Sequence, residues 1–148
     1  PPDAGADRSK LAAAARNGTG ADRARALHAL TCLAGPAEEP LLLGGLMDPD
    51  PRVRLWSATG LGRAGSARSV GPLLGLLSDP HFLVRSRASD ALRYLGLRGQ
   101  ARAGLSRETL VSPAEGVRAG LLEAAGREPY VYIKRRMHMA HAAWESIR

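Results

Sequence analysis

The sequence predicts an all-α fold built from stacked helix pairs. Ala and Leu are abundant while only 4% of the 148 residues are aromatic, and this composition favours helices over strands. Apolar residues recur at helical spacing along much of the chain. One stretch also repeats with a period of 31 residues, and a fixed period of roughly 20 to 50 residues is typical of solenoids.

The repeat is clearest in the middle of the chain, where residues 48–65 realign on residues 79–96. A degraded copy precedes them at the same offset, and a further copy follows at an offset of 33. Each copy has a polar residue in a turn and an Arg six residues later. The pairs are Asn17 with Arg23, Asp48 with Arg54, Asp79 with Arg85, and Ser112 with Arg118. The chain is therefore expected to hold four repeat units.

Each unit is expected to contain two helices. The first helices are predicted at residues 9–16, 36–47, 67–77 and 100–111, and the second at residues 21–34, 51–64, 83–95 and 113–125. Asp50-Pro51 and Ser112-Pro113 suit the start of a helix, while Gly35, Gly65, Gly96 and Gly126 stand where a helix end favours glycine. One domain over residues 1–148 follows, with repeats at about 5–35, 36–65, 66–96 and 97–126.

A last helix is predicted at residues 129–147. It begins at Pro129 and carries Ile133, Met137, Ala140 and Trp144 on one face. An apolar face at the end of a solenoid needs a neighbour to bury it, so we expect this helix to cover the last repeat.

The pattern resembles the HEAT repeat, in the short form found in phycobilin lyases and many bacterial proteins. The resemblance covers about residues 9–126 and rests on the turn Asp placed six residues before the Arg of a Val-Arg pair. It implies a right-handed α-solenoid in which these side chains form a ladder between neighbouring repeats. The ladder residues would be Arg23, Asp48, Arg54, Asp79, Arg85 and Arg118.

The resemblance also implies that the second helices line a concave surface. The register stacks their outward residues in three columns: Arg25, Trp56, Arg87 and Gly120; His28, Thr59, Asp90 and Glu123; and Cys32, Arg63 and Tyr94. A Trp between two Arg residues can stack on a base, hold a cation or anchor an apolar side chain. The alternative is that Trp56 packs over Gly60 and Gly62 or along the Arg stems.

The net charge of +7, from 21 basic and 14 acidic residues, raises the possibility of nucleic-acid binding. Phosphates would meet Arg25, Arg63, Arg87 and the basic run at residues 134–136. Against this, Asp90 and Glu123 would repel a polyanion, and four arginines are assigned to the ladder. Nucleic acid therefore stands as the second hypothesis.

The leading hypothesis is a non-enzymatic scaffold or adaptor that binds a partner protein through its concave groove. Its contact residues would be Arg25, His28, Trp56, Thr59, Arg63, Arg87, Asp90, Tyr94 and Glu123. A third possibility is an enzyme of lyase type or a HEAT-like DNA glycosylase, since Asp90 with Arg87 and Trp56 is loosely similar to the site of those glycosylases. The di-iron hydroxylases of this fold carry repeated His-Glu dipeptides, which this sequence lacks.

No metal or cofactor is expected. His138, His141 and Glu145 have a spacing that places three ligands on one helix face, but such a pattern is more typical of a polar helix rim.

A single cysteine, Cys32, predicts a reducing compartment. The longest apolar stretch, residues 41–47, is too short to span a bilayer, so we expect a cytoplasmic protein. The oligomeric state and the partner's identity stay open.

Overall fold

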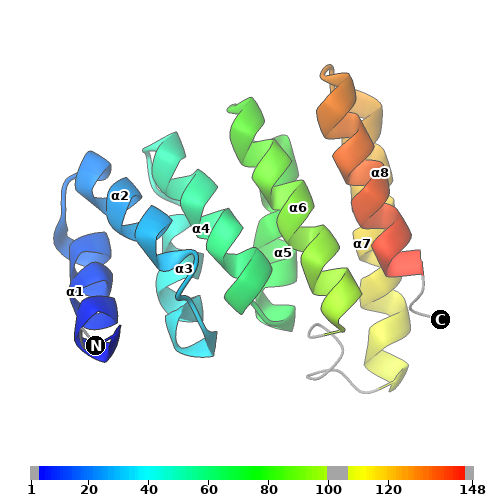
Figure 1. The fold of residues 1–148 in the computed structure, drawn as a ribbon. Helices are drawn as coiled ribbons and strands as arrows, with labels where there is room; N and C mark the ends of the chain where they lie inside the picture. Colours follow the sequence, from blue (N-terminus) through cyan, green and yellow to red (C-terminus); the bar gives the residue numbers. More distant parts are fainter. Residues whose placement is uncertain (1–3, 100–106, 146–148) are drawn as a thin grey trace.

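The computed structural model describes residues 4–99 and 107–145, and within these ranges the chain forms α-helices and short 3-10 turns without a strand. The helices follow one another as α1 (Ala4–Asn17), α2 (Gly20–Leu30), η1 (Pro36–Glu38), α3 (Glu39–Gly45), α4 (Pro51–Ala64), α5 (Ala67–Gly75), η2 (Leu76–Ser78), α6 (Phe82–Arg98), α7 (Arg107–Arg127) and α8 (Val131–Glu145). Successive pairs stand side by side (Figure 1), as expected of an all-α solenoid.

Side chains at the helix starts explain several of these boundaries. The side chains of Thr19, Asp50 and Ser66 each accept a hydrogen bond from a backbone N–H in the first turn of α2, α4 and α5, which satisfies a donor that the helix itself leaves unpaired. At the other end of α6, Gly99 has a φ of 61°, a left-handed conformation that glycine adopts without a steric penalty.

The helices form two rows, with α2, α4, α6 and α8 in front of α1, α3, α5 and α7 in the view of Figure 1. Neighbours in the first of these rows pack extensively on one another, whereas neighbours in the second touch only marginally. Tighter spacing along one row bends a stack of helix pairs toward that row. We therefore call α2, α4, α6 and α8 the inner row, and its exposed side the concave face.

The core lies between the two rows and continues from one pair to the next. Val53, Val84 and Ile133 occupy the same place in α4, α6 and α8 and are at most 1% exposed. Leu61 and Leu92 are fully buried two turns further along. Because a single helix pair cannot bury such residues alone, stability comes from stacking the pairs.

The prediction for the fourth repeat is wrong. Helix α7 runs without interruption across Ser112 and Pro113. The sequence predicted a break there, between one helix at 100–111 and another at 113–125. Residues 100–106 of the first predicted helix lie outside the described part. A proline removes one backbone hydrogen bond and bends a helix without necessarily ending it, and Pro72 likewise lies within α5. The fourth pair is therefore α7 with α8.

Helix α8 is thus the inner helix of the fourth pair rather than an added cap. Its turn is Glu128-Pro129, which replaces the Asp-Pro of the preceding repeats, and Ile133 follows five residues later as Val84 follows Asp79. Glu128 comes 49 residues after Asp79 instead of 31, so a search at a fixed period does not reach it.

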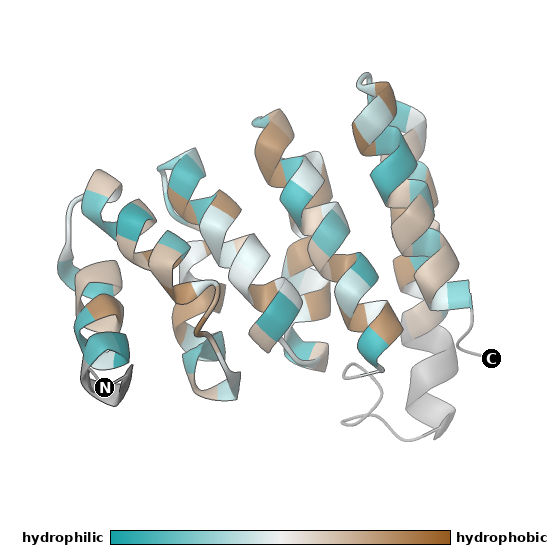
Figure 2. Ribbon diagram, in the orientation of Figure 1, coloured by the Kyte–Doolittle hydropathy of each residue, from teal (hydrophilic) through white to brown (hydrophobic). Residues whose placement is uncertain are grey.

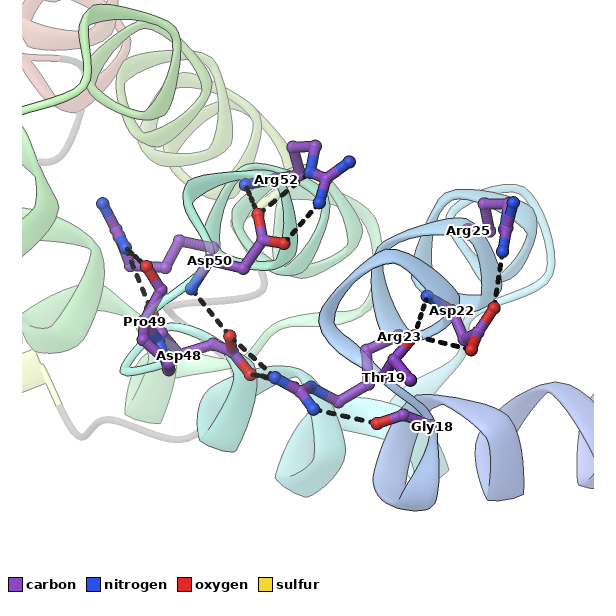
Figure 3. A network of polar contacts seen from close by, with 10 residues as sticks. Gly18, Thr19, Asp22, Arg23, Arg25, Asp48, Pro49, Asp50 and Arg52 are labelled. Carbon is purple, nitrogen blue, oxygen red and sulfur yellow. Dashed lines mark hydrogen bonds and ion pairs between the residues drawn. The ribbon is translucent and has the colours of Figure 1, made fainter.

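Three arginines tie neighbouring repeats together, each through two hydrogen bonds to the acid of the next turn. The distances from Nε and Nη2 are 2.9 and 3.1 Å for Arg23 to Asp48, 2.7 and 3.0 Å for Arg54 to Asp79, and 2.6 and 3.2 Å for Arg85 to Glu128. Figure 3 shows the first of these pairs. Each arginine also donates to a carbonyl of its own turn. The guanidinium therefore fixes two turns at once.

The acids of this ladder are held in the same way in each turn. One oxygen of Asp48, Asp79 and Glu128 accepts from the backbone N–H two residues later. Burial raises the pKa of Glu128, but hydrogen bonds from Arg85 and from the Tyr130 N–H outweigh it and hold the pKa below its usual range. Arg118, predicted as a ladder residue, instead donates to the carbonyl of Trp144 at 3.3 Å.

A second polar contact joins α3 to α5. One oxygen of Glu39 accepts hydrogen bonds from the N–H and hydroxyl of Ser66 and from the hydroxyl of Ser69, at 2.7 to 2.8 Å. Burial raises the pKa of Glu39, but these hydrogen bonds lower it by a larger amount, so the pKa lies below its usual value. The carboxylate is charged at neutral pH and fastens the start of α5.

Candidate protein-binding face

The concave face is built from the exposed sides of α2, α4, α6 and α8. The structure places in this row eight of the residues predicted for the groove: Arg25, His28, Trp56, Thr59, Arg63, Arg87, Asp90 and Tyr94. Glu123, the ninth, lies on α7 in the outer row and is ion-paired with Arg127. Gly120, predicted in the same column as Arg87, is also on α7. Arg136 and Met139 of α8 take their places in the columns.

In the α2–α4 half of this face, nearby acids pair with two of the arginines. Arg25 bonds Asp22 at 2.5 Å and Arg52 bonds Asp50 at 2.7 Å, as Figure 3 shows. These carboxylates neutralise Arg25 and Arg52, whereas Arg63 near the end of α4 has no carboxylate partner among the described residues. A ligand for this half would therefore meet two guanidinium groups whose charge is already balanced.

Trp56 is held by its neighbours. Its ring stacks on His28, with the centroids 3.9 Å apart and the planes 18° from parallel, and its side chain packs partly into the core. One ring face is therefore covered by α2, and Trp56 bridges two inner helices. The stacking on His28 is a contact that the sequence did not indicate.

The α6–α8 half carries a surplus of positive charge. Arg136 forms an ion pair with Asp90. In the described part of the chain Arg87, Arg93 and Arg135 have no carboxylate partner, and the guanidinium of Arg93 lies 5.9 Å from the ring centroid of Tyr94. A hollow of about 370 Å³ opens between these two helices and is lined by Asp90, Arg93, Tyr132, Arg135, Arg136 and Met139; we call it the α6–α8 hollow.

Exposed aromatic rings continue from the α6–α8 hollow toward the start of both helices. Tyr132 lies 6.2 Å from Tyr130 between ring centroids, and Tyr130 lies 5.4 Å from Phe82. These three rings are 36 to 47% exposed, and the Val131 side chain between the two tyrosines is 81% exposed. Hydrophobic and hydrophilic residues thus alternate along the inner row (Figure 2).

A second hollow, of about 680 Å³, lies at the opposite end of the inner helices and includes Cys32, Arg63, Tyr94 and Arg98 in its lining. Arg98 donates to the backbone carbonyls of Gly62 and Arg63 at the end of α4. This guanidinium is therefore engaged in holding α6 to α4, as expected for a cation at a helix C-terminus.

The residues considered for metal binding or for a glycosylase-like site can be placed in the structure. No three His, Cys, Asp or Glu side chains gather there as a metal site requires; His141 lies 3.7 Å from Glu145, and His138 is exposed. Asp90 has Arg136 as its partner, while Trp56 has His28. None of the described helices is long and apolar enough to cross a lipid bilayer.

The model of the family described as HEAT repeats matches residues 8–93, more than half of the chain. The protein belongs to the HEAT repeat family. The match ends within α6, so the fourth HEAT-like pair is defined by the ladder contact of Arg85 with Glu128. No curated protein and no solved structure matches the chain. HEAT repeats generally mediate protein–protein interactions.

Sequence reasoning missed the aromatic and apolar part of the face, namely Phe82, Tyr130, Tyr132 and Met139. All but Phe82 belong to the fourth unit, whose register was misassigned. The signal that finds the fourth unit is Glu128-Pro129. Counting eight and eleven residues from Glu128 gives Arg136 and Met139, just as Arg87 and Asp90 follow Asp79.

Proposed function

We propose that this HEAT-repeat protein is a non-enzymatic scaffold or adaptor that binds a partner protein through the concave face of α2, α4, α6 and α8. The observation that carries the proposal is the makeup of the α6–α8 half, where arginines with no carboxylate partner among the described residues lie beside half-exposed tyrosines and a methionine. Tyr, Met and Arg are the residues enriched in protein interfaces.

The pairing of the other cations favours a protein over a nucleic acid. The three ladder arginines are engaged between repeats, and Arg25, Arg52 and Arg136 each have a carboxylate partner. A nucleic-acid strand needs a continuous basic groove that follows its phosphates. On this face the basic stretch is interrupted by acids.

The test is affinity capture from native lysate with two matched variants. The groove variant is Arg87→Glu with Tyr94→Ala, and the control is Lys10→Glu with Leu122→Ala on the outer row. Tyr94 and Leu122 are 48% and 47% exposed, so both variants reverse one charge and truncate one half-exposed side chain. Circular dichroism verifies that both fold.

We expect wild type and control to capture the same protein and the groove variant to lose it, with binding then reproduced from purified components. Equal capture by the groove variant would exclude this face. Capture that disappears after nuclease treatment would instead support the nucleic-acid hypothesis.

A further inference from the structure

We infer that the partner presents an acidic segment, and that this segment docks in the α6–α8 hollow. The inference rests on the proposed function and names the chemistry of the occupant. Its basis is the uneven distribution of unpaired positive charge along the concave face.

Charge complementarity identifies the occupant. In the α2–α4 half, Arg25 and Arg52 are neutralised by carboxylates of their own segment. Arg63, which has no such partner among the described residues, lines the other hollow, near Cys32. In the α6–α8 half Arg93 and Arg135 line the hollow from opposite helices without an ion-pair partner among the described residues. A carboxylate entering between them would gain two charge-assisted contacts without displacing a protein group.

Arg136 adds a third donor group with a fixed position. Its Nη1 is bound to Asp90 across the two helices, and a guanidinium has five N–H donors in a rigid fork. Asp90 therefore holds Arg136 in place while donors remain for a ligand. This geometry costs little side-chain entropy on binding, because the arginine is already ordered.

Apolar surface borders these charges on both sides. Tyr132 and Met139 lie two turns apart on α8 and line the hollow, and they are 46% and 41% exposed. Tyr132 also joins the hollow to the rings of Tyr130 and Phe82. The matching segment therefore combines acidic residues with an aromatic or aliphatic one.

The same features disfavour a nucleic-acid strand. The hollow contains a carboxylate of its own, Asp90, and its arginines cover only a short stretch, whereas a strand needs a basic groove that follows its phosphates. A polyanion would also run from the hollow toward the α4 end of the face, where Asp50 neutralises Arg52. An acidic protein segment, by contrast, needs only a short stretch of positive charge.

The experiment measures fluorescence anisotropy with labelled probes on the whole protein. The main probe is a peptide of about 12 residues, which can extend over at most about 40 Å, composed of Glu and Asp around one central Phe. A second peptide has Gln and Asn at the acidic positions, a third has Ala in place of Phe, and a single-stranded oligonucleotide of similar length serves as the phosphate probe. The hollow variant combines Arg93→Glu and Arg135→Glu. The α1 variant combines Lys10→Glu and Arg16→Glu, and it makes the same change of net charge on α1.

We expect the acidic Phe peptide to bind wild type and the α1 variant equally, and the hollow variant at least about tenfold more weakly. The amide peptide and the Ala peptide should both bind more weakly than the main probe, and affinity should fall with added salt. Equal binding of the acidic and amide peptides, or equal loss in both charge variants, would overturn the inference. Tighter binding of the oligonucleotide would also overturn it.

The two proposals fail separately. If the acidic peptide does not bind while the Arg87→Glu, Tyr94→Ala variant still loses the captured protein, the proposal of an acidic segment is wrong, and the proposal that the concave face binds the partner is retained. If that variant keeps its partner, the concave face itself is wrong, whatever the peptide does.

Discussion

Removing one acid of the ladder should reveal how much each contact between repeats contributes to stability. We consider Asp79→Ala, because Asp79 and Arg54 lie at the centre of the stack and their side chains are only 4% and 14% exposed. The substitution removes both hydrogen bonds from Arg54 and the bond from the His81 N–H. It leaves the guanidinium with its two backbone carbonyls only.

We expect this change to lower the free energy of unfolding by about 3 kcal/mol. Breaking a buried ion pair by removing one partner costs roughly 3 to 5 kcal/mol, and the partial access of Arg54 to water reduces that cost. The lost backbone hydrogen bond adds about 1 kcal/mol. Asp79→Asn should cost less, because it keeps an acceptor for the His81 N–H.

The measurement is urea unfolding at neutral pH, followed by far-UV circular dichroism. Glu123→Ala is the matched control, since it removes an exposed ion pair with Arg127, and it should cost no more than about 0.5 kcal/mol. A cycle that adds Arg54→Met should give a coupling energy of about 2 kcal/mol. Equal costs for Asp79→Ala and Glu123→Ala would refute the view that the ladder ties the repeats together.

Three further substitutions test individual contacts. Glu39→Gln should flatten the pH dependence of stability in acid, because burial raises the pKa of Glu39 but serine hydrogen bonds lower it more. The stability that the Glu39 carboxylate contributes is therefore fully present above the usual pKa of about 4.3, and it is lost as the pH falls through the lower pKa of the folded state. Urea titrations in which the unfolding free energy falls with pH equally in variant and wild type, between about pH 5 and pH 3, would contradict this. Ser57→Ala should raise the unfolding free energy by about 1 kcal/mol, since its hydroxyl is buried and has no hydrogen-bond partner among the described residues. A loss of stability in the same assay would contradict this. Gly96→Ala should lower the unfolding free energy by about 2 kcal/mol and alter tryptophan fluorescence, because the new Cβ would lie 2.8 Å from Nε1 of Trp144. The control is Gly71→Ala, whose new Cβ meets no described atom within 4 Å. Equal effects of the two substitutions would argue against the close packing of Trp144 on Gly96.

The first three helix pairs could be predicted from the sequence because their markers are similar and evenly spaced. Asp48 and Asp79, 31 residues apart, fix the register of α4 and α6, and Arg23 extends it to α2. The fourth pair could not be found in this way, because its turn acid is Glu128 and follows a longer first helix. Ser112-Pro113, with Arg118 six residues after Ser112, made part of α7 resemble an inner helix.

The candidate site divides along the same line. Residues of α2, α4 and α6 were placed on the concave face by counting, since one register governs all three helices. The pairing of Arg136 with Asp90 and the stacking of His28 on Trp56 depend on the distance between neighbouring helices. A one-dimensional register gives no such distance, so the sequence could not separate the neutralised half of the face from the charged half.

Cross-linking of the complex in native lysate tests the central claim most directly. The chain has only two lysines, one in each row: Lys134 is on α8, next in sequence to Arg135 of the α6–α8 hollow, and Lys10 is exposed on α1. With a lysine-reactive cross-linker and mass spectrometry, we expect the captured partner to be joined to Lys134 and not to Lys10. Links to Lys10 alone would place the partner on the outer row and contradict binding through the concave face.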